Sequence, residues 1–190
     1  MTLRRDFLEL SDSNLIEEIH KGNMMAFEFL VTKYESAVAS TVKSMLGNTV
    51  EADDVGQETF IRFYNSLSSF RGESSIKTYI TRIAINLSLN EIKRRKSKRW
   101  LQFKDNIRDD SLPSDDGDSR DAKEIVNKAL GQLEPNYRSV IVLRLIQSYS
   151  TNETAEILKI PMGTVLSRLA RGQEKLKQIV LKMEKTKSYG

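Results

Sequence analysis

The stretch from Ser150 to Leu176, "STNETAEILKIPMGTVLSRLARGQEKL", is predicted to form two helices separated by a sharp break. Ser150 and Glu153 have the spacing of a capping box, in which two side chains satisfy free backbone N–H groups at the start of a helix. Pro161 cannot continue that helix and disfavours helical geometry in the residue before it, so a second, longer helix is expected directly afterwards. A short helix, a tight turn and a longer helix predict a helix-turn-helix.

The longer helix of this pair separates into an apolar side and a polar side when its residues are placed at intervals of about 100°. The apolar side holds Val165, Leu169, Leu176 and Val180. The polar side holds Thr164, Ser167, Arg168, Arg171, Lys175 and Gln178. Arginine can contact guanine edges and hydroxyl groups can contact bases or phosphates, so this side favours DNA contact. The alternative is the solvated face of a bundle helix, although such a face usually mixes both signs of charge.

The composition of the 190-residue chain excludes several classes of protein. Because the chain has no cysteine, it cannot contain a disulfide framework, a thiolate zinc site or a cysteine nucleophile. Its only histidine, His20, is expected at the surface of an early helix, and no motif supports a Ser-His-Asp arrangement around it. The formal net charge of +4 is too small to imply a polyanionic partner by itself.

Several kinds of segment and site have no signal in the sequence. No apolar run approaches the roughly 18–20 residues that cross a bilayer, and the N-terminus lacks the apolar segment of a signal peptide. We therefore expect a soluble cytoplasmic protein without direct membrane insertion. No metal-ligand spacing or catalytic constellation is recognisable, so we expect no metal, no cofactor, no small-molecule substrate and no enzymatic activity.

Prolines and aspartates divide the chain into two helical regions. None of the three prolines lies before residue 100, so nothing interrupts the helical periodicity of an N-terminal domain over residues 1–99. Residues 100–120 are expected to form a flexible linker, because the stretch from Lys104 to Asp121 holds seven aspartates against three basic residues. Helical periodicity resumes in a C-terminal domain over residues 121–190. The predicted fold class is all-α, with two small helical domains joined by a flexible acidic linker.

The N-terminal domain is expected to contain four helices, at about residues 11–22, 23–47, 52–68 and 75–96. In the C-terminal domain Pro135 is expected to open a helix, with Tyr137, Val140, Ile141 and Leu145 on its core side. No stretch of the chain shows the alternation that is typical of a β-strand.

The predicted helix at about residues 52–68 has an apolar residue in the middle of its outward face. Its core side holds Thr59, Phe60, Phe63 and Leu67. The opposite side holds Asp54, Gln57, Glu58 and Ile61. A lone exposed isoleucine is common, but an apolar centre with a charged rim is also typical of a protein-docking surface. Gly56 costs this helix roughly 1 kcal/mol relative to alanine, and close helix packing is the expected reason for it.

The predicted helix at about residues 75–96 ends in an unusual concentration of positive charge. A narrow polar strip runs along it, made of Arg82, Asn86, Asn90 and Lys93. Residues 93–99, "KRRKSKR", then place six cations in seven positions, where one or two would be enough to complement the helix dipole. The excess predicts a phosphate-binding surface. The preceding loop, "FRGESS" at residues 70–75, is either an ordinary capped turn or a cradle for an unstacked base.

These three motifs, in this order, resemble the extracytoplasmic-function (ECF) sigma factors of bacterial RNA polymerase. The segment "DDVGQETFIRFY" is similar to that family's core-polymerase-binding helix, and "FRGESSIKTYITRIAINLSLNEIKRRK" is similar to its −10 promoter segment. Residues 133–176 are similar to its −35-reading domain. The resemblance covers about residues 12–98 and 122–178, which is nearly all of the chain outside the predicted linker.

The resemblance implies a role for each motif. Binding to the clamp helices of core polymerase is implied for Asp54, Gln57, Glu58 and Ile61. Binding of the −10 non-template strand and its duplex edge is implied for Phe70, Arg71, Gly72, Ser74, Ser75, Arg82, Asn86, Asn90, Lys93, Arg94 and Arg95. Contact with the −35 element is implied for Thr164, Ser167, Arg168, Arg171 and Lys175. The acidic linker would thread the RNA exit path of polymerase, and an anti-sigma factor is expected to hold the two domains in an inactive arrangement.

Some positions depart from the family pattern, and other functions stay open. The departures are Tyr79, Thr81, Thr154, Leu166 and the pair Gly172-Gln173. Leu166 stands where the family commonly has lysine or arginine, so the −35 sequence cannot be predicted. One alternative function is a free-standing helix-turn-helix regulator, which would bind duplex DNA without polymerase, usually as a dimer. Another is a protein-interaction bundle, which would leave the cationic segment without a use.

Overall fold

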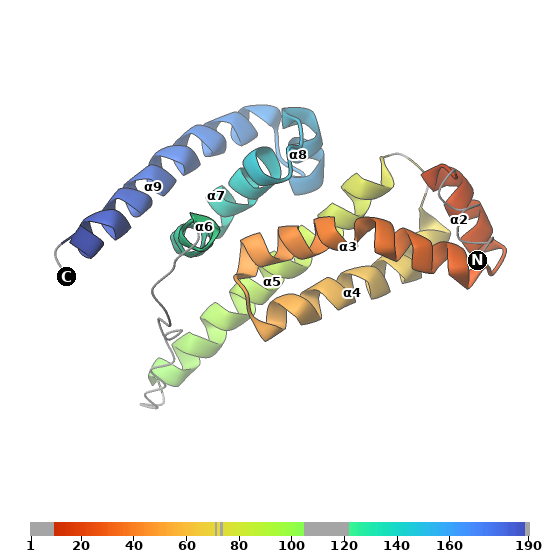
Figure 1. Ribbon diagram of the computed structural model, residues 1–190, viewed down its shortest axis with the longest axis horizontal. Coiled ribbons are helices and arrows are strands. Elements are labelled where there is room, and N and C mark those ends of the chain that lie inside the picture. The colour runs from red at the N-terminus through yellow and green to blue at the C-terminus, as the bar shows by residue number, and fades with distance from the viewer. Residues whose placement is uncertain (1–9, 71, 73, 105–121, 189–190) are drawn as a thin grey trace.

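The computed structural model describes residues 10–70, 72, 74–104 and 122–188, and these residues form helices without any strand (Figure 1). The helices of the N-terminal region are α2 (Asp12–His20), α3 (Met24–Leu46), α4 (Val50–Ser66), η1 (Leu67–Ser69) and α5 (Ile76–Lys104). Those of the C-terminal region are α6 (Ala122–Gln132), α7 (Pro135–Ile141), η2 (Val142–Ile146), α8 (Thr151–Leu158) and α9 (Met162–Ser188). The predicted all-α class is confirmed. In the described part of the chain, no helix is both long enough and apolar enough to cross a membrane.

Side-chain caps fix where the N-terminal helices begin. Ser11, Asn23 and Thr49 each accept a hydrogen bond from a backbone N–H in the first turn of the helix that follows. Each cap satisfies one of the N–H groups that have no partner inside a helix. Gly47 ends α3 with a φ of 81°, a conformation that glycine adopts without steric cost.

Helices α3, α4 and α5 form a three-helix bundle, and α2 packs against α3. The largest fully buried side chains of this bundle include Leu15, Leu30, Met45, Phe63, Ile80 and Ile85. Burying a side chain of this size stabilises the fold by about 1.5–3 kcal/mol. The bundle therefore gives α4 and α5 a rigid support for the residues on their outward faces.

The C-terminal helices contain the predicted helix-turn-helix. The Ser150 hydroxyl accepts a hydrogen bond from the Glu153 N–H, and the Glu153 carboxylate accepts one from the Ser150 N–H at 2.8 Å. Helix α8 then ends at Lys159, whose φ of 52° is left-handed, and α9 begins directly after Pro161. The capping box and the break between the two helices are both confirmed.

One predicted core position in this region is wrong. Leu145 is 50% exposed, whereas Val140 and Ile141 are buried as expected. The chain widens into a π-helix over Val142–Ile146, so the helical spacing that would have placed Leu145 on the core side no longer holds. The sequence pattern assumed a regular α-helix there.

The two groups of helices pack directly against each other (Figure 1). Helices α6 and α7 contact α3, and α8 lies against α5. Val142, Leu143, Tyr149 and Ile157 from the C-terminal helices belong to the same buried cluster as the core of the N-terminal bundle. The structure is therefore a closed arrangement, in which part of the C-terminal group shares the hydrophobic core of the bundle. Leu130, Leu133 and Ile141 form a separate cluster beneath α9.

Candidate protein and nucleic-acid interfaces

The outward face of α4 brings together the four residues predicted to bind a protein. Ile61 is 56% exposed, and Asp54 and Gln57 are also exposed around it. Glu58 completes the rim, and one of its carboxylate oxygens accepts a hydrogen bond from Arg62 Nε at 2.7 Å. Val50, which the sequence analysis missed, is 76% exposed and lies on the same face one turn before Asp54.

A groove of about 620 Å³ runs beside Ile61 between α3 and α4. Its apolar lining consists of Val31, Val38, Ala39, Ala52, Phe60 and Ile61, together with Gly56. Its charged lining is Glu35, Asp53 and Lys43, and Lys43 Nζ lies 3.8 Å from the Asp53 carboxylate. With Asp54 and Glu58 nearby on α4, the groove has an acidic rim around an apolar floor. Such a surface suits a partner that presents apolar and basic side chains.

Gly56 does not serve the close helix packing that the sequence analysis expects. A Cβ atom placed on Gly56 would meet no atom within 4 Å, so the neighbouring helices leave room for a side chain there. At Gly172, by contrast, a Cβ atom would lie 3.2 Å from Ile141 Cγ1, so this is the glycine that permits close packing of α9 on α7. The missing side chain of Gly56 instead keeps the groove between α3 and α4 open.

The loop predicted to cradle a base is anchored on the start of α5. The ring of Phe70 makes an edge contact with Tyr79, with 5.1 Å between the ring centroids. Gly72 has a φ of 71°, which lets the chain turn at this point. Ser75 Oγ accepts a hydrogen bond from the Thr78 N–H and so caps α5. Ser74 is half-buried, and Arg71 lies outside the described residues.

The polar strip of α5 is only partly open in the closed arrangement. Asn86, Asn90 and Lys93 are exposed, whereas the side chain of Arg82 is only 21% exposed. Arg82 Nη2 donates to a carboxylate oxygen of Glu156 in α8 at 2.6 Å. As long as the arrangement stays closed, Arg82 is therefore paired with the helix-turn-helix and is not available to a ligand of the strip.

Hydrogen bonds beside this ion pair hold α8 and the turn before it against the bundle. Thr81 Oγ1 and the Tyr149 hydroxyl lie 2.7 Å apart, and that hydroxyl also lies 3.3 Å from the Lys77 carbonyl. Burial raises the pKa of the Tyr149 phenol, so it remains a neutral donor. We call the Arg82–Glu156 pair and the Thr81–Tyr149 hydrogen bond the closing contact.

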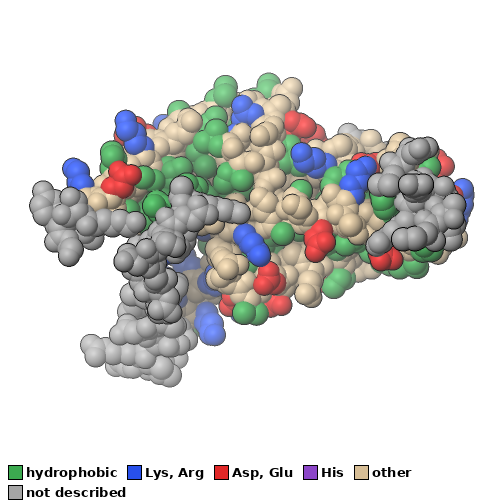
Figure 2. All heavy atoms as spheres, viewed as in Figure 1, with side chains coloured by type: hydrophobic (Ala, Val, Ile, Leu, Met, Phe, Trp, Pro, Cys, Tyr) green, Lys and Arg blue, Asp and Glu red, His purple; other side chains and the backbone are tan. Residues whose placement is uncertain are grey.

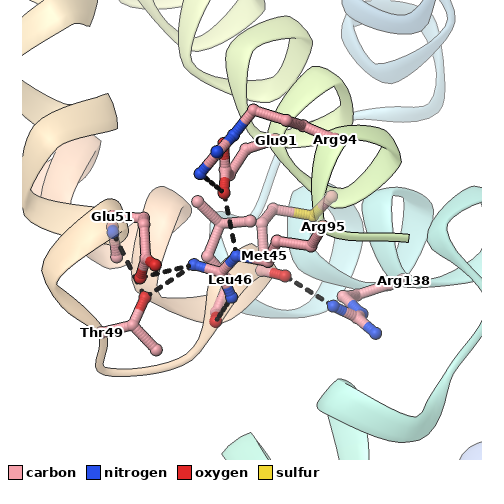
Figure 3. A network of polar contacts seen from close by, with 9 residues as sticks. Met45, Leu46, Thr49, Glu51, Glu91, Arg94, Arg95 and Arg138 are labelled. Atoms are coloured by element: carbon pink, nitrogen blue, oxygen red, sulfur yellow. Dashed lines mark hydrogen bonds and ion pairs between the residues drawn. The ribbon is translucent and has the colours of Figure 1, made fainter. Parts of the chain in front are cut away.

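The cations that follow along α5 differ in what they touch (Figure 3). Arg94 makes two hydrogen bonds to Glu91, at 2.7 and 2.9 Å, and these are the main cause of a lowered pKa of Glu91. Arg95 donates to Thr49 Oγ1 at 2.8 Å, to Glu51 at 3.1 Å and to Glu91 at 3.0 Å. Arg95 therefore ties α5 to the start of α4 instead of facing outward.

Arg138 is a buried cation that the sequence analysis missed. It donates to the carbonyl of Met45 at 2.6 Å and to that of Leu133 at 2.8 Å, and it also bonds the Gly131 carbonyl. Burial lowers the pKa of its guanidinium. The Met45 carbonyl, which Figure 3 shows bonded to Arg138, stands at the C-terminal end of α3. The other two stand at the C-terminal end of α6, and at both ends the helix dipole favours positive charge. Arg138 thus joins the two groups of helices, and no local pattern in the sequence marks it.

Helix α9 keeps its predicted polar residues on one side. Ser167 and Arg171 are exposed, and Thr164 and Arg168 are half-buried. Lys175 Nζ bonds a carboxylate oxygen of Glu134 at 3.0 Å and lies 5.2 Å from the centre of the Tyr137 ring. Ser167 Oγ donates to the Thr164 carbonyl at 3.1 Å, so Arg171 is the exposed residue of this face that is most open to a duplex.

The single histidine has a structural contact. His20 Nε2 lies 3.2 Å from the carbonyl oxygen of Leu67, which joins the end of α2 to η1. Within the described ranges, no group of three or more histidine, cysteine, aspartate or glutamate side chains has the arrangement of a metal site. The exposed faces of α4, α5 and α9 and the loop before α5 are thus the candidate sites in the described part of the chain.

Comparison with known proteins places the chain in one family. Residues 30–98 match Sigma-70 region 2, and residues 123–176 match Sigma-70, region 4. The chain is 33% identical over 182 residues to the ECF RNA polymerase sigma factor SigW of Bacillus subtilis (strain 168), with 90% of this chain and 97% of that protein covered. It is 32% identical over 177 residues to the ECF RNA polymerase sigma-E factor of Haemophilus influenzae, with 87% and 93% covered. The chain belongs to the ECF sigma factors of RNA polymerase.

Solved structures show the same fold. CnrH, solved in complex with the cytosolic domain of CnrY, superposes with a TM-score of 0.67 at 25% identity, with 89% of this chain and 96% of that chain covered. The sigma factor RpoE from Bartonella quintana, solved in complex with the anti-sigma factor NepR, superposes with a TM-score of 0.65 at 24% identity. That second comparison covers 81% of this chain and 96% of the other.

Proposed function

We propose that this chain is a dissociable specificity subunit of bacterial RNA polymerase with one task in each domain. Residues 1–99 would bind core polymerase and the −10 element, residues 121–190 would bind the −35 element, and residues 100–120 would tether them. Helix α5 continues into the first part of the predicted tether, as far as Lys104, and residues 105–120 lie outside the described residues. The observation that carries the proposal is the combination, in one chain, of an exposed Ile61 with an acidic rim on α4 and separate polar, cationic faces on α5 and α9. Catalysis of RNA synthesis would belong to polymerase, and the chain would act in the bacterial cytoplasm.

Core polymerase would dock on the outward face of α4. Ile61 is exposed inside a rim of acidic and amide side chains, which is complementary to a partner helix with apolar and basic side chains. We propose that the clamp helices of polymerase are this partner. The neighbouring groove enlarges the apolar area that such a helix can bury. Asp54, Gln57 and Glu58 would fix its orientation.

The −10 strand would run from the loop before α5 along that helix. Phe70 to Ser75, with Asn86, would hold an unstacked base, and Asn90 and Lys93 would contact the backbone beyond it. Arg82 would join this surface after the closing contact breaks. Arg94 would exchange its hydrogen bonds to Glu91 for hydrogen bonds to a DNA phosphate. Arg95 would instead stabilise the fold, because its donors are already bonded to Thr49, Glu51 and Glu91.

Run-off transcription with purified core polymerase on genomic fragments tests this function. The proposal predicts discrete transcripts from a few fragments when the chain is added, and none from core polymerase alone. Transcripts that do not depend on the chain would contradict it.

Replacing Arg171 with Ala is expected to weaken binding of the holoenzyme to its −35 element by about 1–3 kcal/mol, because a bidentate contact to a base edge is lost. The measurement is a binding titration on a promoter fragment and on a fragment with a scrambled −35 element. An equal loss on both fragments would show that Arg171 contacts phosphate only.

The closed arrangement would be the inactive state of the chain, because it removes Arg82 from the −10 surface. We propose that an anti-sigma factor holds this state. CnrH, which has a similar fold, was solved in complex with the cytosolic domain of another protein, CnrY, and this supports the proposal of a protein partner here. Arg82 would be released when that partner leaves and polymerase separates the two domains.

Replacing Glu156 with Ala is expected to increase the affinity of the full-length chain for a single-stranded −10 oligonucleotide about two- to fivefold. The gain is modest because the ion pair is partly exposed to solvent. Fluorescence anisotropy of the labelled oligonucleotide measures it. Glu174→Ala is the matched control, because it removes the same charge from an exposed position whose carboxylate bonds Gln178 within α9. Equal gains in both variants would mean that net charge, and not release of Arg82, is responsible.

A further inference from the structure

The last turns of α5 carry an exposed aromatic side chain among cations. Trp100, the only tryptophan of the chain, is 64% exposed, and Leu101 beside it is also exposed. Within the described residues, a hollow of about 650 Å³ is lined by Lys93, Lys96, Ser97, Trp100 and Leu101. This end of α5 extends beyond the ends of α3 and α4 (Figure 1), and the buried core of the bundle does not include it.

Trp100 continues the polar strip of α5 that is proposed to follow the −10 strand. The strip of Arg82, Asn86, Asn90 and Lys93 is extended in the same register by Ser97 and Trp100. Trp100 lies 18 residues after Arg82, and 18 residues are about five complete turns of roughly 3.6 residues each. The indole and the Arg82 side chain therefore stand at the same angle around the helix axis.

The charge around Trp100 favours an anionic partner. Lys93, Lys96, Lys98 and Arg99 are all exposed on these turns, and Lys and Arg side chains show along this part of α5 at the lower left of the space-filling view (Figure 2). Glu91 is already engaged by Arg94 and Arg95. Cations that attract phosphates, with an aromatic face between them, are the combination that proteins use to hold nucleic acid through its backbone and bases.

The distance along α5 places Trp100 outside the −10 element. It lies 14 residues beyond Asn86, or about 21 Å at roughly 1.5 Å per residue. At about 3.4 Å per base step, this corresponds to about six base pairs of duplex. A strand held at Asn86 and aligned with α5 would therefore pass Trp100 in the duplex next to the melted region.

We infer that Trp100, together with Lys96 and Ser97, forms a further DNA contact, in which the indole packs on a deoxyribose of the duplex about six base pairs beyond the −10 contacts. The contact would add affinity without reading sequence, because every nucleotide of the duplex carries the same deoxyribose. It rests on the proposed function, since it assumes that promoter DNA follows α5.

Two promoter probes test the inference with the holoenzyme. Both contain the same single-stranded −10 element; the long probe also has ten base pairs of duplex upstream of it, and the short probe has no upstream duplex. Trp100→Ala is expected to weaken binding of the long probe about tenfold and to leave binding of the short probe unchanged. Trp100→Phe is expected to restore most of the loss because it keeps an aromatic face. Leu181→Ala, at an exposed leucine of α9, is the control for removing an apolar side chain elsewhere.

The outcomes separate this contact from the function on which it rests. If the unaltered holoenzyme binds neither probe, the proposed function fails and the contact with it. If that holoenzyme binds both probes but Trp100→Ala binds the long probe equally well, only the contact is wrong. Equal weakening on both probes would also overturn it. So would a blue shift of Trp100 fluorescence when the free chain is mixed with phosphatidylglycerol vesicles, because it would indicate that the indole binds a membrane surface.

Discussion

Replacing Ile61 with Asp is expected to abolish association of the chain with core RNA polymerase while leaving the chain folded. Ile61 is 56% exposed and contributes little to the core, so a carboxylate there costs the fold little. At the centre of a docking face it places a charge where the partner buries apolar surface, and the expected loss of affinity is more than about 30-fold. Co-purification with core polymerase measures the association, and circular dichroism on heating measures the fold.

The control for this variant is Leu181→Asp. It makes a similar aliphatic-to-acid change at an exposed position of α9, away from the docking face. We expect it to co-purify with polymerase as the unaltered chain does. Unchanged co-purification of Ile61→Asp would remove α4 from the interface, and loss in both variants would show a general effect of added negative charge.

At Gly56, alanine is expected to stabilise the chain, and leucine is expected to prevent docking. Because a Cβ atom there meets no neighbour within 4 Å, alanine fits, and it should raise the free energy of unfolding by up to about 1 kcal/mol. Leucine would fill the groove between α3 and α4 and exclude a partner side chain. We expect Gly56→Leu to lower the affinity for core polymerase about 100-fold, as the loss of a central contact in a docking surface does.

Gly131 provides the matched control, because it is also a helical glycine with open space around it, but it lies in α6 away from the groove. Chemical denaturation of the four variants, with alanine and leucine at each glycine, separates stability from binding. If Gly56→Leu and Gly131→Leu bound polymerase with the same affinity, no partner side chain would occupy the groove in the complex. A large drop in stability at Gly56 would contradict the open space that the structure shows.

Much of the fold could be predicted because its signals are local. The capping box of Ser150 and Glu153, the break at Pro161 and the helix opened by Pro135 each depend on residues within one turn of one another, and all three are confirmed. The exposure of Ile61 followed from helical periodicity alone. Periodicity failed at Leu145 because a π-helix changes the spacing that the prediction assumed.

The contacts that join the two groups of helices could not be predicted, because their partners lie far apart in the sequence. Arg82 and Glu156 are 74 residues apart, and Arg138 reaches the carbonyl of Met45 across 93 residues. No periodic pattern connects such positions, so the sequence placed Arg82 on an open DNA-binding strip and gave Arg138 no role. The space beside Gly56 likewise depends on how α3 and α4 pack, which a single helix cannot show.

The most direct test of the account is the affinity of the full-length chain for a promoter duplex, measured with and without core polymerase. The account predicts weak and sequence-independent binding by the free chain, whose Arg82 is held by Glu156. It also predicts tight binding, specific for the −10 and −35 elements, once core polymerase is present. Tight and specific binding by the free chain, unchanged by polymerase, would contradict the account and would instead describe a free-standing helix-turn-helix regulator.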